Sequence, residues 1–428
     1  MRRRLHPAWW VAAVTFVALI GAAGFRSTPG VLMDPLHHEF GWSLGTISAA
    51  VSVNLVLFGV TAPFAAALME RFGIARVVAS ALALVAVGGA LTVFMTASWQ
   101  LILCWGILVG LGTGSMAMGL VATVTSRWFV ARRGVISGVL AAASSTGQLV
   151  FLPLLSFLAV HHGWRSASLT VAAAALAVVP LVLWLLRDRP ADLGLAPYGG
   201  EFVEPAPPAR GTAGLALRTL RDAARTGPFW VLAVSFAICG MSTNGLVQTH
   251  FIPAAGDHGM PETTAAGLLA LAGVFDIAGT IGSGWLTDRF GAPRVLLAVY
   301  YGLRGLSLLV LPRLFADIVH PSMLVFTVFY GLDWIATVPP TMALCRQCFG
   351  QRAPVVFGWV FAAHQLGAAL ASIGAGILRD RLGNYELAWY IAGFLCLGAA
   401  VLSLNVRTSR VAVPFRDRPI ELAEPVGS

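Results

Sequence analysis

Long apolar stretches separated by short polar gaps dominate this chain of 428 residues. Stretches of about 20 residues, the length that spans the hydrocarbon core of a bilayer as a helix, recur about twelve times. They run over 9–33, 44–69, 75–97, 100–126, 134–160, 165–186, 228–253, 263–286, 294–315, 321–346, 354–378 and 387–406. Backbone in lipid must satisfy its own hydrogen bonds, so the pattern predicts an all-α membrane protein with twelve transmembrane helices.

A polar interruption at 187–226 divides these segments into two sets of six. We expect an N-terminal bundle at 1–186, a cytoplasmic linker loop at 187–226, a C-terminal bundle at 227–406 and a cytoplasmic tail at 407–428. The two halves repeat, since Phe129, Arg132, Gly138 and Gly147 recur as Phe349, Arg352, Gly358 and Gly367, 220 positions later. This duplication predicts two pseudo-symmetric bundles with a site between them, as in rocking-switch transporters.

Composition agrees with a lipid environment, because 57% of the residues are hydrophobic and only 11% are charged. The net charge of +9 needs no nucleic acid partner to explain it. With both termini in the cytoplasm, most arginines fall in cytoplasmic segments, as the positive-inside rule expects. We therefore expect a multi-pass protein of the inner (plasma) membrane, functional as a monomer, whose partners are the lipid bilayer and small molecules.

The sequence does not favour an enzyme, a cofactor or a metal site. The five cysteines are scattered, and the single CxxC at 345–348 has no further ligands near it, so helix packing is the preferred interpretation. The stretch "GILVGLGTGSMAMG" follows no strand and lies within an apolar segment, so it predicts close helix packing rather than a dinucleotide loop.

Ionisable residues near the middle of apolar segments are the main functional candidates, since each costs ~2.5–3.5 kcal/mol to insert. We expect a substrate site that uses Arg26, Asn244, Arg304 and His364, and proton coupling by Asp276 and Asp333. Two alternatives are that an Arg304–Asp333 ion pair only joins two helices, and that Arg26 extends toward the outer surface.

The polar gaps at "GSGWLTDRFGAPR" and "AALMERFGIAR" have similar patterns, with Glu70 and Asp288 separated by 218 positions. The motif Gly284-x-x-x-Asp288-Arg289-x-Gly291-x-x-Arg294, with the twelve helices and the central loop, resembles the major facilitator superfamily. The resemblance implies that Asp288 and Glu70, with Arg289 and Arg71 beside them, close an inner gate by bonding to basic residues of the other half. Candidate partners are Arg127, Arg132, Arg346 and Arg352. The alternative is a solvated turn.

Within that superfamily the chain is most similar to the monocarboxylate porters. Three stretches carry the resemblance: Arg26 where the family usually has Lys, Asp276 in "GVFDIAG", and "GILRDRLGNYELAWYIAG". Thr280 stands where the family commonly has an Arg, and we infer that Arg304 replaces that cation. The resemblance implies alternating-access transport of a small organic anion with proton symport.

Two other functions remain open at the sequence level. A drug/proton antiporter would usually carry an Arg where this chain has Gly106. A transport-inactive membrane sensor would not need the intact gate motif. A cavity that contains Arg26 would favour an acid, whereas an acidic, aromatic cavity that excludes Arg26 would favour a cationic drug.

Overall fold

The computed structural model describes residues 6–116, 118–200 and 212–406. These residues form helices and one isolated parallel bridge between Phe129 and Tyr198. Part of the expected linker, 201–211, and the expected tail, 407–428, lie outside the described residues. Among the described residues, eleven helices are long and apolar enough to cross a membrane. The predicted all-helical membrane architecture is confirmed.

The N-terminal half contains six expected apolar segments, and each falls in a helix or a run of consecutive helices. These are α1 (Pro7–Phe40), α2 (Leu44–Phe72), α3 (Ile74–Thr92), the run α4 (Ser98–Leu101), η1 (Ile102–Val109), α5 (Gly110–Met116) and α6 (Met118–Trp128), then α7 (Arg133–His162) and α8 (Trp164–Leu185). The segment predicted at 134–160 lies in α7, whose described apolar run is Thr146–His162.

Two short helices follow in the linker, η2 (Pro190–Leu193) and α9 (Thr212–Ala223). The C-terminal half then contains the run α10 (Gly227–Gly240), η3 (Met241–Val247) and α11 (Gln248–Gly256), then α12 (Glu262–Phe290), α13 (Pro293–Val310) with η4 (Leu311–Arg313), the broken pair α14 (Pro321–Asp333) and α15 (Val338–Phe349), η5 (Gly350–Arg352), α16 (Ala353–Leu382) and α17 (Glu386–Leu404).

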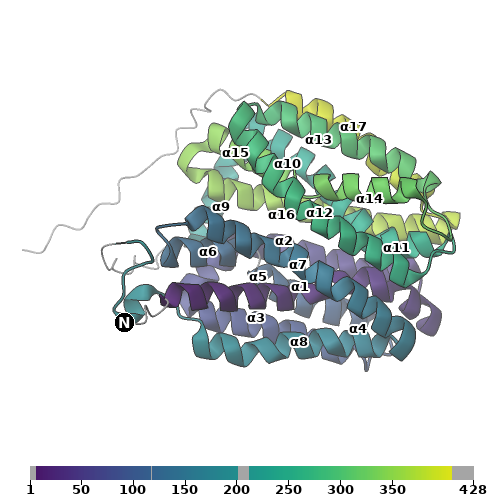
Figure 1. Cartoon of the computed structure of the whole chain (residues 1–428), viewed down its shortest axis with the longest axis horizontal. Coiled ribbons are helices and arrows are strands. Elements are labelled where there is room, and N and C mark those ends of the chain that lie inside the picture. Colours follow the sequence, from purple (N-terminus) through teal and green to yellow (C-terminus); the bar gives the residue numbers. More distant parts are fainter. Residues whose placement is uncertain (1–5, 117, 201–211, 407–428) are drawn as a thin grey trace, which may run out of the picture.

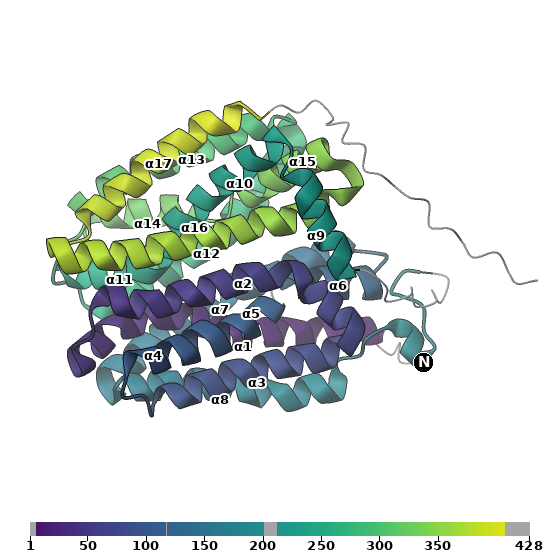
Figure 2. The same ribbon diagram turned by 180° about the vertical axis from the view of Figure 1, so that it is seen from behind.

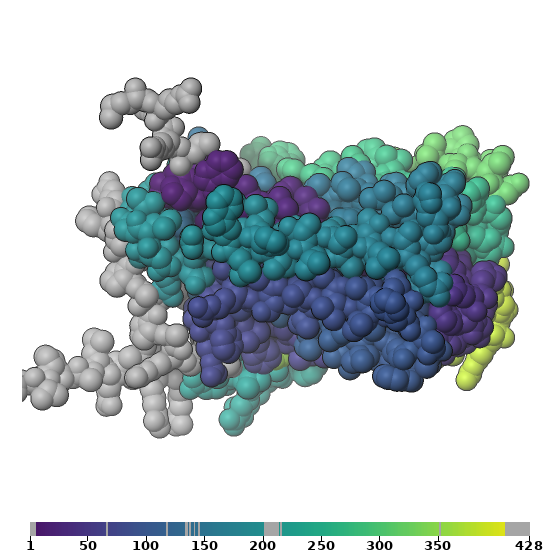
Figure 3. Space-filling view, turned by 90° about the horizontal axis from the view of Figure 1, so that it is seen from below, coloured from purple at the N-terminus to yellow at the C-terminus, as the bar shows by residue number. Residues whose placement is uncertain are grey.

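The helices of each half form a bundle, and the two bundles lie side by side (Figures 1 and 2). Helix α9 lies at the same end of the molecule as the N-terminus and packs against α2 and α16, one helix from each half. We call this end the linker face and the opposite end the far face. The space-filling view in Figure 3 shows the side of the molecule that the N-terminal half forms, as a closely packed surface.

Among the described residues, the closest packing between the two halves is that of α2 with α16, α7 with α12, and α1 with α11. The α2–α16 pair is close because glycine stands at the contact. A Cβ atom added to Gly59 would lie 2.6 Å from the Cβ of Gln365. Ser52 also donates its hydroxyl hydrogen to the Ala369 carbonyl, at 2.7 Å. Small residues thus let these helix backbones approach at the seam between the halves.

At the far face, α16 supplies a carboxylate to the beginning of α2. Asp380 accepts hydrogen bonds from the backbone N–H of Leu44 at 2.9 Å and of Gly45 at 2.7 Å. The first N–H groups of a helix have no partner within the helix. Ser43 accepts from the third, that of Thr46, at 3.1 Å. The beginning of α2 is therefore capped partly by its own chain segment and partly by the other half.

Candidate functional site

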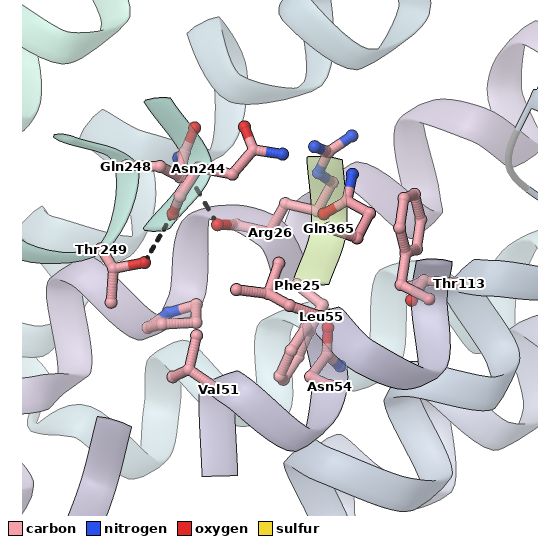
Figure 4. A pocket seen from close by; sticks show the side chains of 12 residues that line it. Phe25, Arg26, Val51, Asn54, Leu55, Thr113, Asn244, Gln248, Thr249 and Gln365 are labelled. Atoms are coloured by element: carbon pink, nitrogen blue, oxygen red, sulfur yellow. Dashed lines mark hydrogen bonds between the residues drawn. The ribbon is translucent and has the colours of Figure 1, made fainter. Parts of the chain in front are cut away.

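A small pocket lies where the two halves meet, and its unfilled volume of about 440 Å³ includes the open solvent at its mouth. Its walls come from α1, α2 and α5 of one half and from η3, α11 and α16 of the other (Figure 4). Its polar residues are Arg26, Asn54, Thr113, Asn244, Gln248, Thr249 and Gln365. The apolar residues are Phe25, Pro29, Val51, Leu55 and Phe58. None of the described residues that line the pocket is acidic, so its only formal charge is that of Arg26.

Arg26 projects from the middle of α1 into this pocket (Figure 4). Its guanidinium carbon lies 5.4 Å from the centre of the Phe58 ring, which contributes the favourable contact between a cation and an aromatic face. The backbone carbonyl of Arg26 accepts from the Gln248 amide at 3.5 Å. The pocket therefore combines a planar, permanently charged donor with an adjoining apolar wall.

Several of the other polar groups in the pocket already bond to the protein. Asn54 donates to the Trp105 carbonyl at 2.7 Å, which ties α2 to η1. The Thr113 hydroxyl donates to the Val109 carbonyl at 2.8 Å. The Gln248 side chain accepts from Gln148 of α7, across the seam between the halves. These bonds fix the walls of the pocket.

The structure brings two of the expected substrate residues, Arg26 and Asn244, into the same pocket from opposite halves. His364 lies next to Gln365 in sequence, but it is buried between two aromatic rings. Its ring centre is 4.8 Å from that of Phe236 and 5.8 Å from that of Phe361. Arg304, also expected here, lies outside the lining of this pocket.

Arg304 is fully buried at the break between α14 and α15. Its Nε donates to the Asp333 carboxylate at 2.6 Å. One terminal nitrogen donates to the backbone carbonyls of Asp333 at 2.6 Å and Trp334 at 3.0 Å, and the other to the Cys239 sulfur at 2.9 Å. These partners all belong to the C-terminal half, as the ion-pair alternative expected.

The break itself follows from the sequence, because Pro339 and Pro340 lack the N–H groups that would continue the helical ladder. Residues 334–337 form turns instead. Side chains of α12 bond to the groups that the break exposes. Asp276 accepts from the Ile335 N–H at 3.0 Å, and Ser283 donates to the Ala336 carbonyl. Asp276 and Arg304 thus both bond to backbone within the break.

The expected gate residues lie at the linker face. Glu70 has its Oε1 3.9 Å from a terminal nitrogen of Arg127, which belongs to the same half. The Arg71 guanidinium lies over the ring of its neighbour Phe72. Asp288 and Arg289 are exposed at the end of α12.

Two further expected gate partners have different surroundings. Arg352 is 3.5 Å from Asp222 of the linker helix α9, and Arg132 adopts a left-handed backbone conformation with φ of 60°. The Arg352 contact brings the linker helix into the same region as the gate residues.

Sequence reasoning missed the glutamines of the site. Gln148, Gln248 and Gln365 stand in otherwise apolar segments. A polar amide in such a segment was the feature of the sequence that could have identified them. The five cysteines are buried and free, and the described residues contain no group of three or more potential metal ligands.

Two helical halves that meet at a polar pocket are the arrangement expected of a membrane transporter. The family model of the Major Facilitator Superfamily matches residues 15–353 and 251–424. The chain belongs to the Major Facilitator Superfamily, and both its relatives and its fold are those of transporters rather than enzymes.

Similar proteins include transporters of several kinds. The MFS-type transporter YcxA of Bacillus subtilis (strain 168) is 25% identical, over 98% of both chains. Monocarboxylate transporter 13 of Bos taurus is 28% identical, over 92% of this chain and 88% of its own. Among solved structures, a D-xylose-proton symporter has a TM-score of 0.72 at 13% identity and covers 94% of this chain and 99% of its own, which shows the fold alone.

Proposed function

We propose that this transporter carries a small monocarboxylate anion, bound at Arg26 between the two halves, together with a proton. The observation that supports the anion most strongly is the charge of the pocket, whose only charged lining residue among those described is Arg26. A guanidinium offers two parallel N–H donors to a carboxylate. The relatives named monocarboxylate transporters agree with this substrate class.

The rest of the pocket suits the same substrate. Phe25, Leu55 and Val51 form an apolar wall for a short carbon skeleton, and Asn244 of the other half adds amide donors. A substrate held by both Arg26 and Asn244 would link the halves, as alternating access requires. A cationic drug would meet Arg26 without a compensating carboxylate in the described lining, so drug/proton antiport is disfavoured.

We assign the proton to Asp276, a carboxyl group that is 4% exposed in the middle of α12. Because its Oδ1 accepts from the Ile335 N–H, gain of a proton changes the bond that holds the helix break. Proton binding is thereby linked to the shape of α14 and α15. One proton and one monoanion make an electroneutral load.

The test of the anion site is uptake of radiolabelled short-chain acids by proteoliposomes under an inward proton gradient. Replacing Arg26 with Gln should abolish saturable uptake, because the carboxylate loses its cation. Replacing Arg165 with Gln is the matched control, since this exposed arginine pairs with Glu39 at 2.6 Å on the far face. Wild-type uptake by Arg26→Gln proteoliposomes would contradict the proposed site.

The proton assignment has its own test in the same proteoliposomes. Asp276→Asn should abolish accumulation driven by a proton gradient while leaving exchange of internal for external substrate, because the neutral amide no longer binds and releases a proton. If Asp276→Asn still concentrates substrate, the proton site lies at Asp333 or His364 instead.

We further propose that the chain acts as a monomer in the inner membrane with both termini and the linker loop in the cytoplasm. The excess of arginine at the linker end of the halves supports this orientation. Labelling of a cysteine introduced at position 205 by an impermeant reagent in whole cells would contradict it.

A further inference from the structure

One amide side chain in the pocket has no partner in the described structure. Gln365 of α16 is 0% exposed, and neither its Nε2 nor its Oε1 has a hydrogen-bond partner among the described residues. The same side chain lines the pocket (Figure 4). Buried polar groups are nearly always hydrogen-bonded, so the amide of Gln365 needs a partner, which water or a bound molecule in the pocket can supply.

Packing keeps this amide at the pocket. The Cβ of Gln365 lies against Gly59, at the closest part of the α2–α16 seam. Four residues further along α16, the Ala369 carbonyl is bonded to Ser52 of α2 at 2.7 Å. Because the seam fixes the beginning of the side chain, the amide has little freedom to turn away from the pocket toward another partner.

The amide group presents two N–H donors on Nε2 and one acceptor oxygen, Oε1, and this restricts what can satisfy it. Water serves both in an empty pocket, but a bound substrate displaces water. A hydroxyl group can accept from Nε2 and donate to Oε1 at once. An oxo group can only accept, which leaves Oε1 unpaired, and an unsubstituted alkyl chain leaves both atoms unpaired.

We propose that Gln365 is a specificity-determining residue that selects, among small carboxylic acids, those that carry a hydroxyl group. The inference rests on the proposed function, in which Arg26 holds the carboxylate. Arg26 and Gln365 come from different halves and line the same pocket, so one hydroxy acid spans the seam. A site built to hydrogen-bond a hydroxyl discriminates against analogues without it, because the buried groups are then left unpaired.

The test is calorimetric titration of the purified protein in lipid nanodiscs with four acids: butanoate, 2-oxobutanoate, 2-hydroxybutanoate and 3-hydroxybutanoate. For the wild type we expect the better hydroxy acid to bind roughly tenfold to a hundredfold more tightly than butanoate, the effect of leaving a buried hydrogen-bonding group unpaired. The oxo acid should lie between them.

Two variants separate recognition from general damage to the pocket. Gln365→Met keeps a long unbranched side chain next to Gly59 but removes the amide, so it should bind all four acids with about the affinity of butanoate. Thr15→Val is the matched control, because Thr15 is buried on α1 outside the pocket lining and its hydroxyl hydrogen bonds to the Val11 carbonyl at 2.8 Å. This control should keep the wild-type preference.

The outcomes distinguish the inference from the proposed function. If the wild type binds the acids without regard to the hydroxyl, or if Gln365→Met keeps the preference, the role of Gln365 is refuted while the acid site stands. If the wild type binds none of the four acids, the proposed function fails and the inference fails with it. Monodispersity and thermal unfolding of each variant check that the fold is intact.

Discussion

Replacing Asp380 with Asn should open the far face of this transporter. The Asp380 carboxylate, on α16, accepts from the N–H groups of Leu44 and Gly45 at 2.9 and 2.7 Å, and so joins the C-terminal half to the beginning of α2. These bonds must break when the halves separate at this face. They therefore stabilise the far-closed state relative to the far-open state.

The size of the effect follows from the geometry. The asparagine side chain of the variant keeps one acceptor oxygen for one of the two N–H groups. It presents its NH₂ group to the other N–H, so about one hydrogen bond to a charged acceptor is lost. Such bonds contribute about 1.5–3 kcal/mol, and the exposure of Asp380 favours the lower end because water can replace the lost acceptor. Since 1.4 kcal/mol corresponds to a factor of ten, the ratio of far-open to far-closed molecules should rise roughly tenfold.

Electron–electron double resonance between spin labels at the exposed positions 38 and 381 measures this ratio directly. Both positions lie at the far face, one in each half, so opening adds a longer distance to the distribution. Glu39→Gln is the control, because Glu39 bonds to Arg165 at 2.6 Å at the far face within the N-terminal half. An unchanged distribution in Asp380→Asn, or an equal shift in the control, would refute the reasoning.

Two further predictions concern the C-terminal half, and both are read from thermal unfolding. Arg304→Gln should destabilise the protein by about 3–5 kcal/mol, because it leaves the Asp333 carboxylate buried without its cation, and adding Asp333→Asn should recover part of the loss. Gly279→Ala should destabilise by about 1–3 kcal/mol, because the new methyl group meets the Leu332 backbone, whereas Gly282→Ala on the same helix meets open space and should stabilise slightly. A double variant no better than Arg304→Gln, or equal effects of the two alanines, would contradict these explanations.

The helices of this protein were predictable because hydrophobic length alone determines a transmembrane segment. The roles of the buried charges were not, since they depend on contacts between distant segments. Asp276 and Ile335 are 59 positions apart, and Arg304 and Asp333 are 29 apart. The sequence identified Pro339 and Pro340 as a disruption, but only the packing of α12 against α14 shows which side chains meet the exposed backbone.

The residues of the pocket also differ in whether the sequence alone could identify them. Arg26 could be recognised because a cation in an apolar helix is rare and costly. Gln365 could not, since an amide in a membrane helix usually pairs with a neighbour. Its significance comes from a property that sequence does not contain, the lack of a partner for both amide atoms at a closely packed seam.

The duplicated turns also show what an internal repeat predicts and what it leaves open. Glu70 and Asp288 occupy matched places in the two halves, yet Glu70 lies beside Arg127 and Asp288 is exposed. An internal repeat preserves the position of a residue within its own bundle. The partner of that residue depends on the neighbouring surface, and the two halves have diverged in those surfaces. Asp380 is a carboxylate that does join the halves, and it has no acidic counterpart 220 positions earlier, where Val160 stands. We therefore expect closure of the far face to depend on a residue present in only one half, so that a single substitution there shifts the balance between the two open states in one direction.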